Sequence, residues 1–247
     1  MFYLGVDAGG TNTSLALITK DGEVRSYLVT KELDLQAFNF SGICRILAEA
    51  LGTLCGRAGI RREDIAYSVW GLPGYGEDLK NSLYLEKLVG EILANTKYTC
   101  VNDVEVAWIG SLAGNPGLHI VAGTGTIGFG KDAKGKTART GGWSEIFGDE
   151  GSAYWLGIEL LRLFSRQADY RLERSTLYFL LQKHYSLKRD LDLIARVRKE
   201  KSRKDIARLA MLTFQAARAG DNNAITLFRR AAFELSLIAK ALLKQLS

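Results

Sequence analysis

The chain has 247 residues, of which 47% are hydrophobic and 24% are charged, and its formal net charge is +6. This composition is typical of a globular protein and excludes a disordered chain, a collagen and a disulfide miniprotein. No apolar run approaches the roughly 18 residues of a membrane span, and the start lacks the basic segment of a signal peptide. Three cysteines without a C-x-x-C pair predict reduced thiols in a cytoplasmic protein.

Charge and glycine are unevenly distributed along the chain. Residues 1–150 hold 14 basic and 18 acidic residues, whereas residues 151–247 hold 19 and 9. Of the 26 glycines, 23 fall in the first part and three in the second. We therefore expect strands and turns first, then helices with a basic surface. The basic stretch 188–205 has no aromatic residue for base stacking, so it indicates a solvated helix face and no nucleic-acid partner.

The first half of the sequence predicts both strands and helices. Residues 40–58 carry apolar side chains at helical spacing, and Lys20-Asp21-Gly22 is typical of a hairpin between two strands. The predicted strands cover residues 2–7, 13–19, 23–30, 65–71 and 98–102, and the predicted helices cover 40–58, 82–95 and 104–113.

The second half opens in the same way and then becomes helical. A strand at 118–123 runs into a glycine turn, and Asp221 is a plausible start for the last helix. This recurrence predicts an α/β protein with two domains of similar plan, 1–114 and 115–247, facing each other across a cleft. The further predicted strands cover 126–131 and 137–141, and the predicted helices cover 151–166, 173–184, 189–199, 203–218 and 222–246.

Two glycine-rich turns follow buried strands and are suited to binding phosphate. Glycines let the backbone approach an anion and present N–H groups to it, and a carboxylate at the strand tip, Asp7, can hold Mg²⁺ through water. An ordinary glycine hairpin is the alternative for each turn. The candidate nucleotide-binding residues are Gly9, Gly10, Thr11, Asn12 and Thr13 in the first turn, and Gly123, Thr124, Gly125 and Thr126 in the second.

Asp103 lies where the predicted strand 98–102 meets a helix. A carboxylate at this junction can cap the helix. It can also act as a general base that takes the proton of a substrate hydroxyl while the oxygen attacks the terminal phosphorus of ATP. Phosphoryl transfer depends mostly on positioning and charge neutralisation, so one aspartate, Mg²⁺ and two amide-rich turns would suffice.

Five motifs in this order resemble one known family. They are Asp7-Ala-Gly-Gly-Thr-Asn-Thr13, Gly71-Leu-Pro-Gly-Tyr-Gly-Glu77, Asn102-Asp103, Ala122-Gly-Thr-Gly-Thr126 and Gly141-Gly-Trp-Ser-Glu-Ile-Phe-Gly-Asp-Glu-Gly-Ser-Ala-Tyr-Trp-Leu-Gly157. Together they resemble the BadF/BadG/BcrA/BcrD ATPase family and, within it, the N-acetylglucosamine kinases. The last motif is the most specific.

The resemblance implies two ribonuclease-H-like domains of the actin-like ATPase fold, with ATP and a sugar in the cleft. It implies that Asp7 serves Mg²⁺, that both turns hold phosphates, and that Asp103 is the catalytic base. Glu150 would either bind sugar or cap the helix that starts near Gly151. The residues implied for the sugar pocket are Asn39, Asp103, Thr124, Gly142, Trp143, Asp149 and Ala153; for Trp143, core packing is the alternative.

The sequence departs from the family pattern at three places. Asn12 stands where many relatives carry a basic residue, and Thr126 replaces a common serine. Relatives also continue beyond the position of Ser247 with further strands and an adenosine loop. We therefore expect a second domain that is incomplete at its C-terminus, with an unpaired sheet edge, poor ATP affinity, and an uncovered apolar stripe on the last helix. Either a longer product, a homodimer or a partner chain would cover this region.

The sequence as a whole predicts a sugar kinase. The expected reaction is ATP-dependent phosphorylation of a hexose or amino sugar, with N-acetylglucosamine or glucosamine at O6 as the leading substrate. One alternative is the ATPase activator of a 2-hydroxyacyl-CoA dehydratase or benzoyl-CoA reductase system, although Cys44, Cys55 and Cys100 lack the arrangement that its iron–sulfur cluster requires. The other alternative is a non-catalytic sugar sensor.

Overall fold

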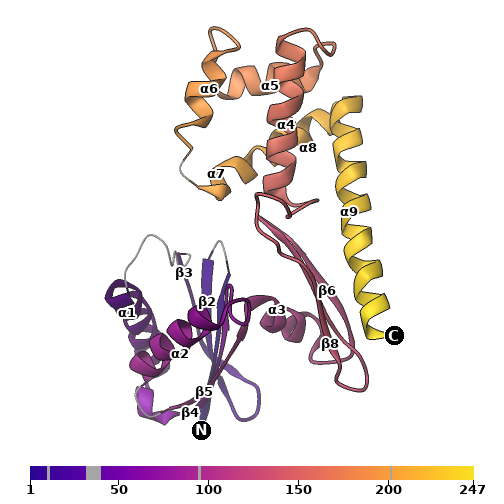
Figure 1. Cartoon of the computed structure of the whole chain (residues 1–247). Coiled ribbons are helices and arrows are strands. Elements are labelled where there is room, and N and C mark those ends of the chain that lie inside the picture. The colour runs from indigo at the N-terminus through magenta and orange to yellow at the C-terminus, as the bar shows by residue number, and fades with distance from the viewer. Residues whose placement is uncertain (10–11, 32–39, 94–95, 201) are drawn as a thin grey trace. The chain divides into compact units, whose positions relative to one another are not determined.

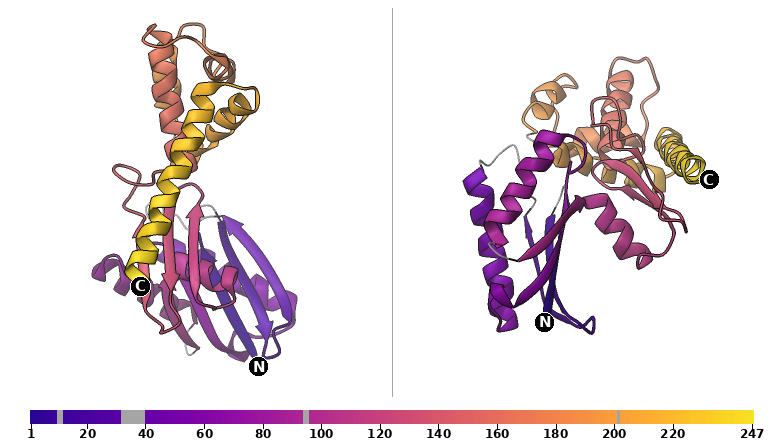
Figure 2. Two further views of the ribbon diagram at one scale, coloured as in Figure 1. Left: turned by 90° about the vertical axis from the view of Figure 1, so that its right-hand side faces the viewer. Right: turned by 60° about the horizontal axis from the view of Figure 1, so that its bottom comes forward.

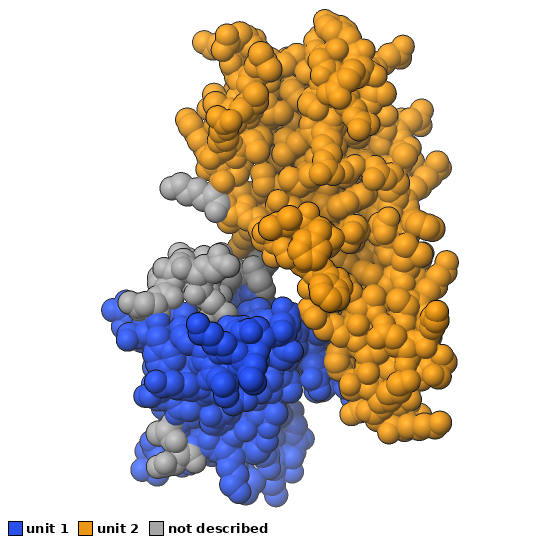
Figure 3. Space-filling view, in the orientation of Figure 1, with its two compact units in different colours: residues 1–115 blue, residues 116–247 orange. Residues whose placement is uncertain are grey.

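The computed structural model describes residues 1–9, 12–31, 40–93, 96–200 and 202–247. The chain divides into two compact units, residues 1–115 and residues 116–247 (Figures 1 and 3). Each unit contains one sheet, so the predicted mixed α/β class is confirmed. Among the described residues, no helix combines the length and the apolar character that crossing a membrane requires.

The first unit is built on a five-stranded sheet in the order β3-β2-β1-β4-β5. The first three strands pair antiparallel, while β4 and β5 run parallel to β1. The predicted hairpin between β2 and β3 is confirmed, since the Thr19 N–H donates to the Glu23 carbonyl at 2.9 Å and Gly22 has φ of +84°. The strands are β1 (Phe2–Ala8), β2 (Asn12–Thr19), β3 (Val24–Lys31), β4 (Ile65–Leu72) and β5 (Lys97–Asn102).

Helices cover both faces of this sheet. Helices α1 (Phe40–Ala58) and α2 (Leu79–Leu93) pack together on one face, and α3 (Asp103–Leu112) lies on the other (Figures 1 and 2). A short 3₁₀ helix, Arg62–Asp64, precedes β4. The core forms where alternate strand residues meet the apolar stripes of α1 and α2. Its buried residues include Leu4, Val6, Leu15, Leu17, Ile43, Leu47, Leu51, Leu54, Leu85 and Leu88.

The second unit begins with a three-stranded antiparallel sheet. It consists of β6 (Gly117–Ala122), β7 (Thr126–Lys131) and β8 (Thr137–Gly141), so β6 and β8 are the edges among the described strands. The long helix α9 (Asn222–Leu246) lies along this sheet (Figure 2, left). A Cβ atom at Gly128 would lie 2.9 Å from Cδ1 of Leu242. Glycine in β7 therefore lets the helix approach the sheet closely.

The expected uncovered stripe on the last helix is only partly right. Ala231 is buried in a cluster with Leu156 of α4 (Ala153–Ala168), and Ile238 and Leu242 pack against glycines of β7 and β8. Only Leu243 is exposed among the five residues of that stripe, which are Ala231, Leu235, Ile238, Leu242 and Leu243. Phe233 and Leu237 are also exposed. That a further segment or chain covers β6 stays a prediction.

The remaining helices form a small helical core of their own. Leu160 and Phe164 of α4 pack against Tyr178 and Leu181 of α5, and the Phe164 and Tyr178 rings stack with centroids 4.9 Å apart. Asp221 caps α9 as predicted, since its carboxylate accepts from the Asn223 N–H at 2.9 Å. The helices are α4 (Ala153–Ala168), α5 (Thr176–His184), α6 (Asp192–Val197), α7 (Arg203–Arg208) and α8 (Ala210–Arg218).

Two predicted helices differ from the structure. The helix expected at 189–199 shortens to α6, and the one expected at 203–218 is interrupted at Leu209, whose N–H bonds the carbonyl of Ile206 at 3.0 Å. A Cβ atom at Gly157 would clash with that same Ile206 carbonyl. The expected helix 203–218 therefore breaks close to Ile206, where α7 packs tightly against Gly157 of α4.

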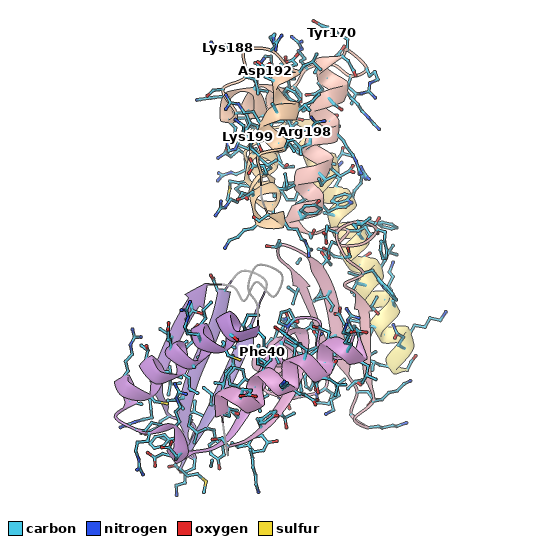
Figure 4. All side chains as sticks on the ribbon, turned by 60° about the vertical axis from the view of Figure 1, so that its left-hand side comes forward. Phe40, Tyr170, Lys188, Asp192, Arg198 and Lys199 are labelled. Atoms are coloured by element: carbon cyan, nitrogen blue, oxygen red, sulfur yellow. The ribbon has the colours of Figure 1, made fainter. Side chains whose placement is uncertain are left out.

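The basic stretch around α6 is largely solvated, as predicted. Lys188, Arg198 and Lys199 are exposed, and Arg189 pairs with Asp192 at 2.8 Å. Figure 4 shows Lys188, Asp192, Arg198 and Lys199 on this segment. Arg203 is also exposed, but its guanidinium pairs with a buried carboxylate of the candidate site.

Candidate functional site

The first cluster of site residues forms where three parallel strands end. In the sheet register, Asp7 of β1 lies beside Gly71 of β4, and Gly71 lies beside Val101 of β5. Asn102 ends β5, and Asp103 is the first residue of α3. Because the carboxyl ends of parallel strands share one edge of the sheet, Asp7 and Asp103 lie at the same edge.

Asp103 is fixed by the helix that it begins. Asn102 is the N-cap of α3, and its side chain accepts from the Val104 N–H at 3.2 Å. One carboxyl oxygen of Asp103 accepts from the same N–H at 2.9 Å. Capping is therefore the role of Asn102. Among the other described residues, only the Val104 N–H donates a hydrogen bond to the Asp103 carboxylate.

Glycine in the second motif lets α3 approach the sheet. A Cβ atom at Gly71 would lie 2.8 Å from Cγ2 of Val106 and 3.3 Å from Cα of Asp103. The loop after Gly71 is also tied to this helix start, because the Asn102 side chain donates to the Tyr75 carbonyl at 3.0 Å. The Gly71–Glu77 motif thus holds the start of α3, and with it Asp103, close to the end of β4.

The electrostatics of this cluster favour a proton acceptor. The pKa of Asp103 is raised to about 6, mainly by burial, with further increases from the charges of Asp7 and Glu77 and a decrease from the Val104 N–H. Burial also raises the pKa of Asp7. A carboxylate with a pKa near the working pH is well suited to general-base catalysis.

The two aspartates also fit a bound cation. Neither of them forms an ion pair with a basic residue in the described ranges, and the negative charge of Asp7 raises the pKa of Asp103. A divalent cation next to Asp7 would relieve this repulsion, and carboxylate oxygen is the ligand type that Mg²⁺ prefers. Asp7 therefore fits the predicted role toward Mg²⁺.

The first glycine turn is described only in part. Gly10 and Thr11, together with Asn39 of the predicted sugar pocket, lie outside the described residues. Asn12 is exposed at the start of β2, whereas Thr13 is fully buried and its hydroxyl has no partner among the described residues. The Thr13 side chain faces the core, so only its backbone lies next to the turn.

The second glycine turn is held by the start of α4. The N–H groups of Ala153 and Tyr154 donate to the carbonyls of Gly123 and Thr124 at 2.9 and 3.3 Å, and Ser152 caps the helix. The exposed Glu150 is therefore not the N-cap.

The most specific motif forms a loop between β8 and α4. Gly142, with φ of +69°, donates its N–H to the Thr126 carbonyl at 2.9 Å. Trp143 is 66% exposed, so core packing is wrong for this residue. Asp149 is 5% exposed and accepts from the Thr126 N–H at 2.9 Å. Within the second unit, hydrogen bonds thus connect the loop residues Gly142 and Asp149 to Thr126 in the second glycine turn. Ala153, at the start of α4, is bonded to the same turn.

A cavity of about 300 Å³ lies between this loop and α9. It is lined by Trp143 and Asp149 from the loop and by Leu237 and Ile238 from the helix. Thr126 also lines it, and its buried hydroxyl has no partner in the part of the chain that the structure describes. An aromatic face, a carboxylate and a free hydroxyl are groups that a sugar can use.

The sequence did not single out Arg203 as a site residue. Its guanidinium forms an ion pair with Asp149 and lies 3.4 Å from the Glu145 carboxylate. In the sequence, Arg203 belongs to the basic stretch 188–205, where it resembles its solvated neighbours. No local pattern distinguishes it, because its partners lie more than 50 residues away.

The cysteines belong to the core of the first unit. Cys55 and Cys100 are buried, Cys44 is partly buried, and all three are free thiols. Burial, together with the charge of Glu86, raises the pKa of Cys100 to about 12. This agrees with the prediction of reduced structural thiols.

The two sheets and their helices have the fold of actin-like ATPases and sugar kinases. A model of the BadF/BadG/BcrA/BcrD ATPase family matches residues 4–247, so the chain belongs to this family. The family and fold class predicted from the motifs are therefore confirmed.

Three relatives illustrate this similarity. The chain is 29% identical to an N-acetylmuramic acid/N-acetylglucosamine kinase of Clostridium acetobutylicum, over 100% of the chain and 80% of that protein. It is 27% identical to an N-acetyl-D-glucosamine kinase of Dictyostelium discoideum, over 99% of the chain and 80% of that protein. A crystal structure from Chromobacterium violaceum, provisionally assigned as an N-acetylglucosamine kinase, is 26% identical with a TM-score of 0.80, and the match covers 98% of the chain and 82% of that structure.

Proposed function

We propose that the chain is an ATP-dependent kinase that phosphorylates an amino sugar, with N-acetylglucosamine as the leading substrate and its 6-hydroxyl as the acceptor. The observation that carries this proposal is Asp103: it follows the parallel strand β5 at the same sheet edge as Asp7, and its pKa is raised to about 6. The names of the relatives, which are N-acetylglucosamine kinases, support the choice of sugar.

In this reaction Asp103 takes the proton of the sugar hydroxyl. Among the other described residues, only the Val104 N–H donates to its carboxylate, which therefore remains available to the substrate. Asp7 would hold Mg²⁺ through water, and the turns Gly9–Thr13 and Gly123–Thr126 would hold phosphates. When bound, Mg²⁺ neutralises negative charge on the phosphate oxygens.

In the second unit, the sugar would lie against the loop between β8 and α4. Trp143 would offer an apolar face, and Asp149 would accept hydrogen bonds from sugar hydroxyls. The buried Thr126 hydroxyl, which lacks a partner among described residues, would be satisfied by a ligand in the cavity. We also propose that a second copy, a partner chain or a further segment covers an unpaired edge of this unit's sheet.

A coupled ADP-release assay tests the proposed function. The purified chain is supplied with saturating ATP and Mg²⁺ and with glucosamine, N-acetylglucosamine, N-acetylmuramic acid, glucose or mannose. We expect ADP release that depends on the sugar and is fastest with N-acetylglucosamine, and a product that mass spectrometry and ³¹P NMR identify as the 6-phosphate. If no sugar stimulates ADP release and calorimetry detects no sugar binding, the proposal is wrong.

A further inference from the structure

Asp149 has an unusual backbone conformation and a buried carboxylate. Its φ is +61°, a left-handed value that few residues with a side chain adopt. Its side chain is 5% exposed. A buried carboxylate is stable only when partners satisfy it, so the groups around Asp149 decide where its oxygens point.

Two groups of the second unit satisfy this carboxylate. One oxygen accepts from the Thr126 N–H at 2.9 Å, and the other pairs with the Arg203 guanidinium. Arg203 begins α7, and its side chain remains 43% exposed. A charged pair at the one buried carboxylate of an otherwise largely exposed loop thus joins that loop to a helix distant in sequence.

The Arg203 guanidinium also reaches other parts of the loop and α4. A second guanidinium nitrogen lies 3.4 Å from the Glu145 carboxylate, and the Tyr154 ring lies 5.8 Å from the guanidinium carbon. A planar guanidinium can bind two carboxylates through different nitrogens, whereas an ammonium group is a single point of charge. Lysine could therefore replace only part of these contacts.

The pair packs directly against the second glycine turn. A Cβ atom at Gly125 would lie 2.9 Å from the Asp149 carboxylate and 3.0 Å from the Arg203 guanidinium. Any side chain at this position would push the ion pair away from the turn. The turn, Asp149 and Arg203 therefore form one packed unit.

We propose that Arg203 is a positioning residue for the sugar, because it fixes the Asp149 carboxylate beside the second glycine turn without touching the substrate itself. This inference rests on the proposed function, in which Asp149 binds a sugar hydroxyl. It assigns a role in substrate binding to a residue of the helical region that no sequence motif includes.

A double-mutant cycle on sugar affinity tests this role. Calorimetry measures the Kd for N-acetylglucosamine in the wild type, Arg203→Ala, Asp149→Asn and the double variant, each in the full chain. We expect Arg203→Ala to weaken binding about tenfold or more, and the double variant to bind no more weakly than the weaker single variant, because coupled residues are not additive. Arg203→Lys should fall between the wild type and Arg203→Ala.

A matched control comes from the same helix. Arg208 also lies in α7 and pairs with Asp205 at 3.1 Å, away from the loop. Arg208→Ala should leave the Kd within about twofold, as expected for an exposed pair of little energetic value. Added guanidinium ion should restore part of the affinity of Arg203→Ala and none of that of Asp149→Asn, which a purely structural defect would not produce.

The possible outcomes test the proposed function and the positioning role of Arg203 separately. A wild type that binds no sugar overturns the proposed function together with the role of Arg203. A wild type that binds sugar, with an Arg203→Ala variant that folds and binds equally well, overturns only the positioning role. Additive effects in the double variant also overturn it. If Arg203→Ala does not fold, Arg203→Lys takes its place in the cycle.

Discussion

In the Asp103→Asn variant, a proton acceptor is lost together with a buried negative charge. We therefore expect turnover and stability to change in opposite directions. Removal of a general base lowers kcat by about 10²- to 10⁴-fold. Removal of the charge should stabilise the ligand-free fold, because asparagine can still accept the Val104 N–H bond that one Asp103 oxygen accepts at 2.9 Å.

The gain in stability follows from the pKa of Asp103. That pKa rises from the ordinary 3.8 to about 6 in the folded protein, chiefly through burial. At about 1.4 kcal/mol for each pH unit, the ionised carboxylate costs the fold roughly 2 to 3 kcal/mol. Part of this cost is the repulsion between the Asp103 carboxylate and the charges of Asp7 and Glu77. Asparagine at position 103 removes that repulsion.

The sign of the pH dependence is fixed by linkage. The folded state binds the Asp103 proton more tightly than the unfolded chain, so this residue makes the fold less stable as pH rises from about 4 to about 6. The stability advantage of Asp103→Asn should thus be near zero below about pH 4 and reach its full size above about pH 6. Urea unfolding of both proteins across this range, without Mg²⁺ or nucleotide, measures it.

A charge-removing control lies in the same helical turn. Glu105 is in the first turn of α3, where it interacts favourably with the helix N-terminus. Glu105→Gln should retain turnover and lose about 0.3 to 1 kcal/mol of stability. If Asp103→Asn is less stable than the wild type near pH 7, or if it keeps turnover within about tenfold, the reasoning about Asp103 is refuted.

Three further predictions concern packing, the exposed loop and the thiols. Gly157→Ala should lower stability by about 1 to 3 kcal/mol, since its Cβ would clash with the Ile206 carbonyl, whereas Gly56→Ala, with nothing within 4 Å, should be neutral or stabilising in the same urea assay. Trp143→Ala should leave the melting temperature nearly unchanged because the side chain is 66% exposed, yet raise the KM for sugar in the coupled assay; an unchanged KM would remove Trp143 from the site. Cys100, with its pKa raised to about 12, should react with Ellman's reagent only after unfolding, whereas the partly buried Cys44 is a separate thiol; rapid labelling of Cys100 itself in the native protein, located by peptide mapping, would contradict its burial.

The sequence by itself determined the features that depend on neighbours along the chain. The hairpin around Gly22 and the cap at Asp221 follow from the conformations and hydrogen bonds of a few adjacent residues, and both are present. The glycine turn after β6 and the placement of Asp103 after β5 were also predictable. The ordered motifs were enough to identify the family and the fold class.

Only the tertiary structure decided which distant groups meet. The pairing of Arg203 with Asp149 joins residues 54 positions apart, and nothing in the sequence around Arg203 sets it apart from its solvated neighbours. The break at Leu209 and the covered face of α9 likewise arise where one element packs against another. The conformational preferences of neighbouring residues determine where a helix starts. Which helix face is buried, where the helix is interrupted and which ion pairs it forms depend on the elements that pack against it in the folded protein.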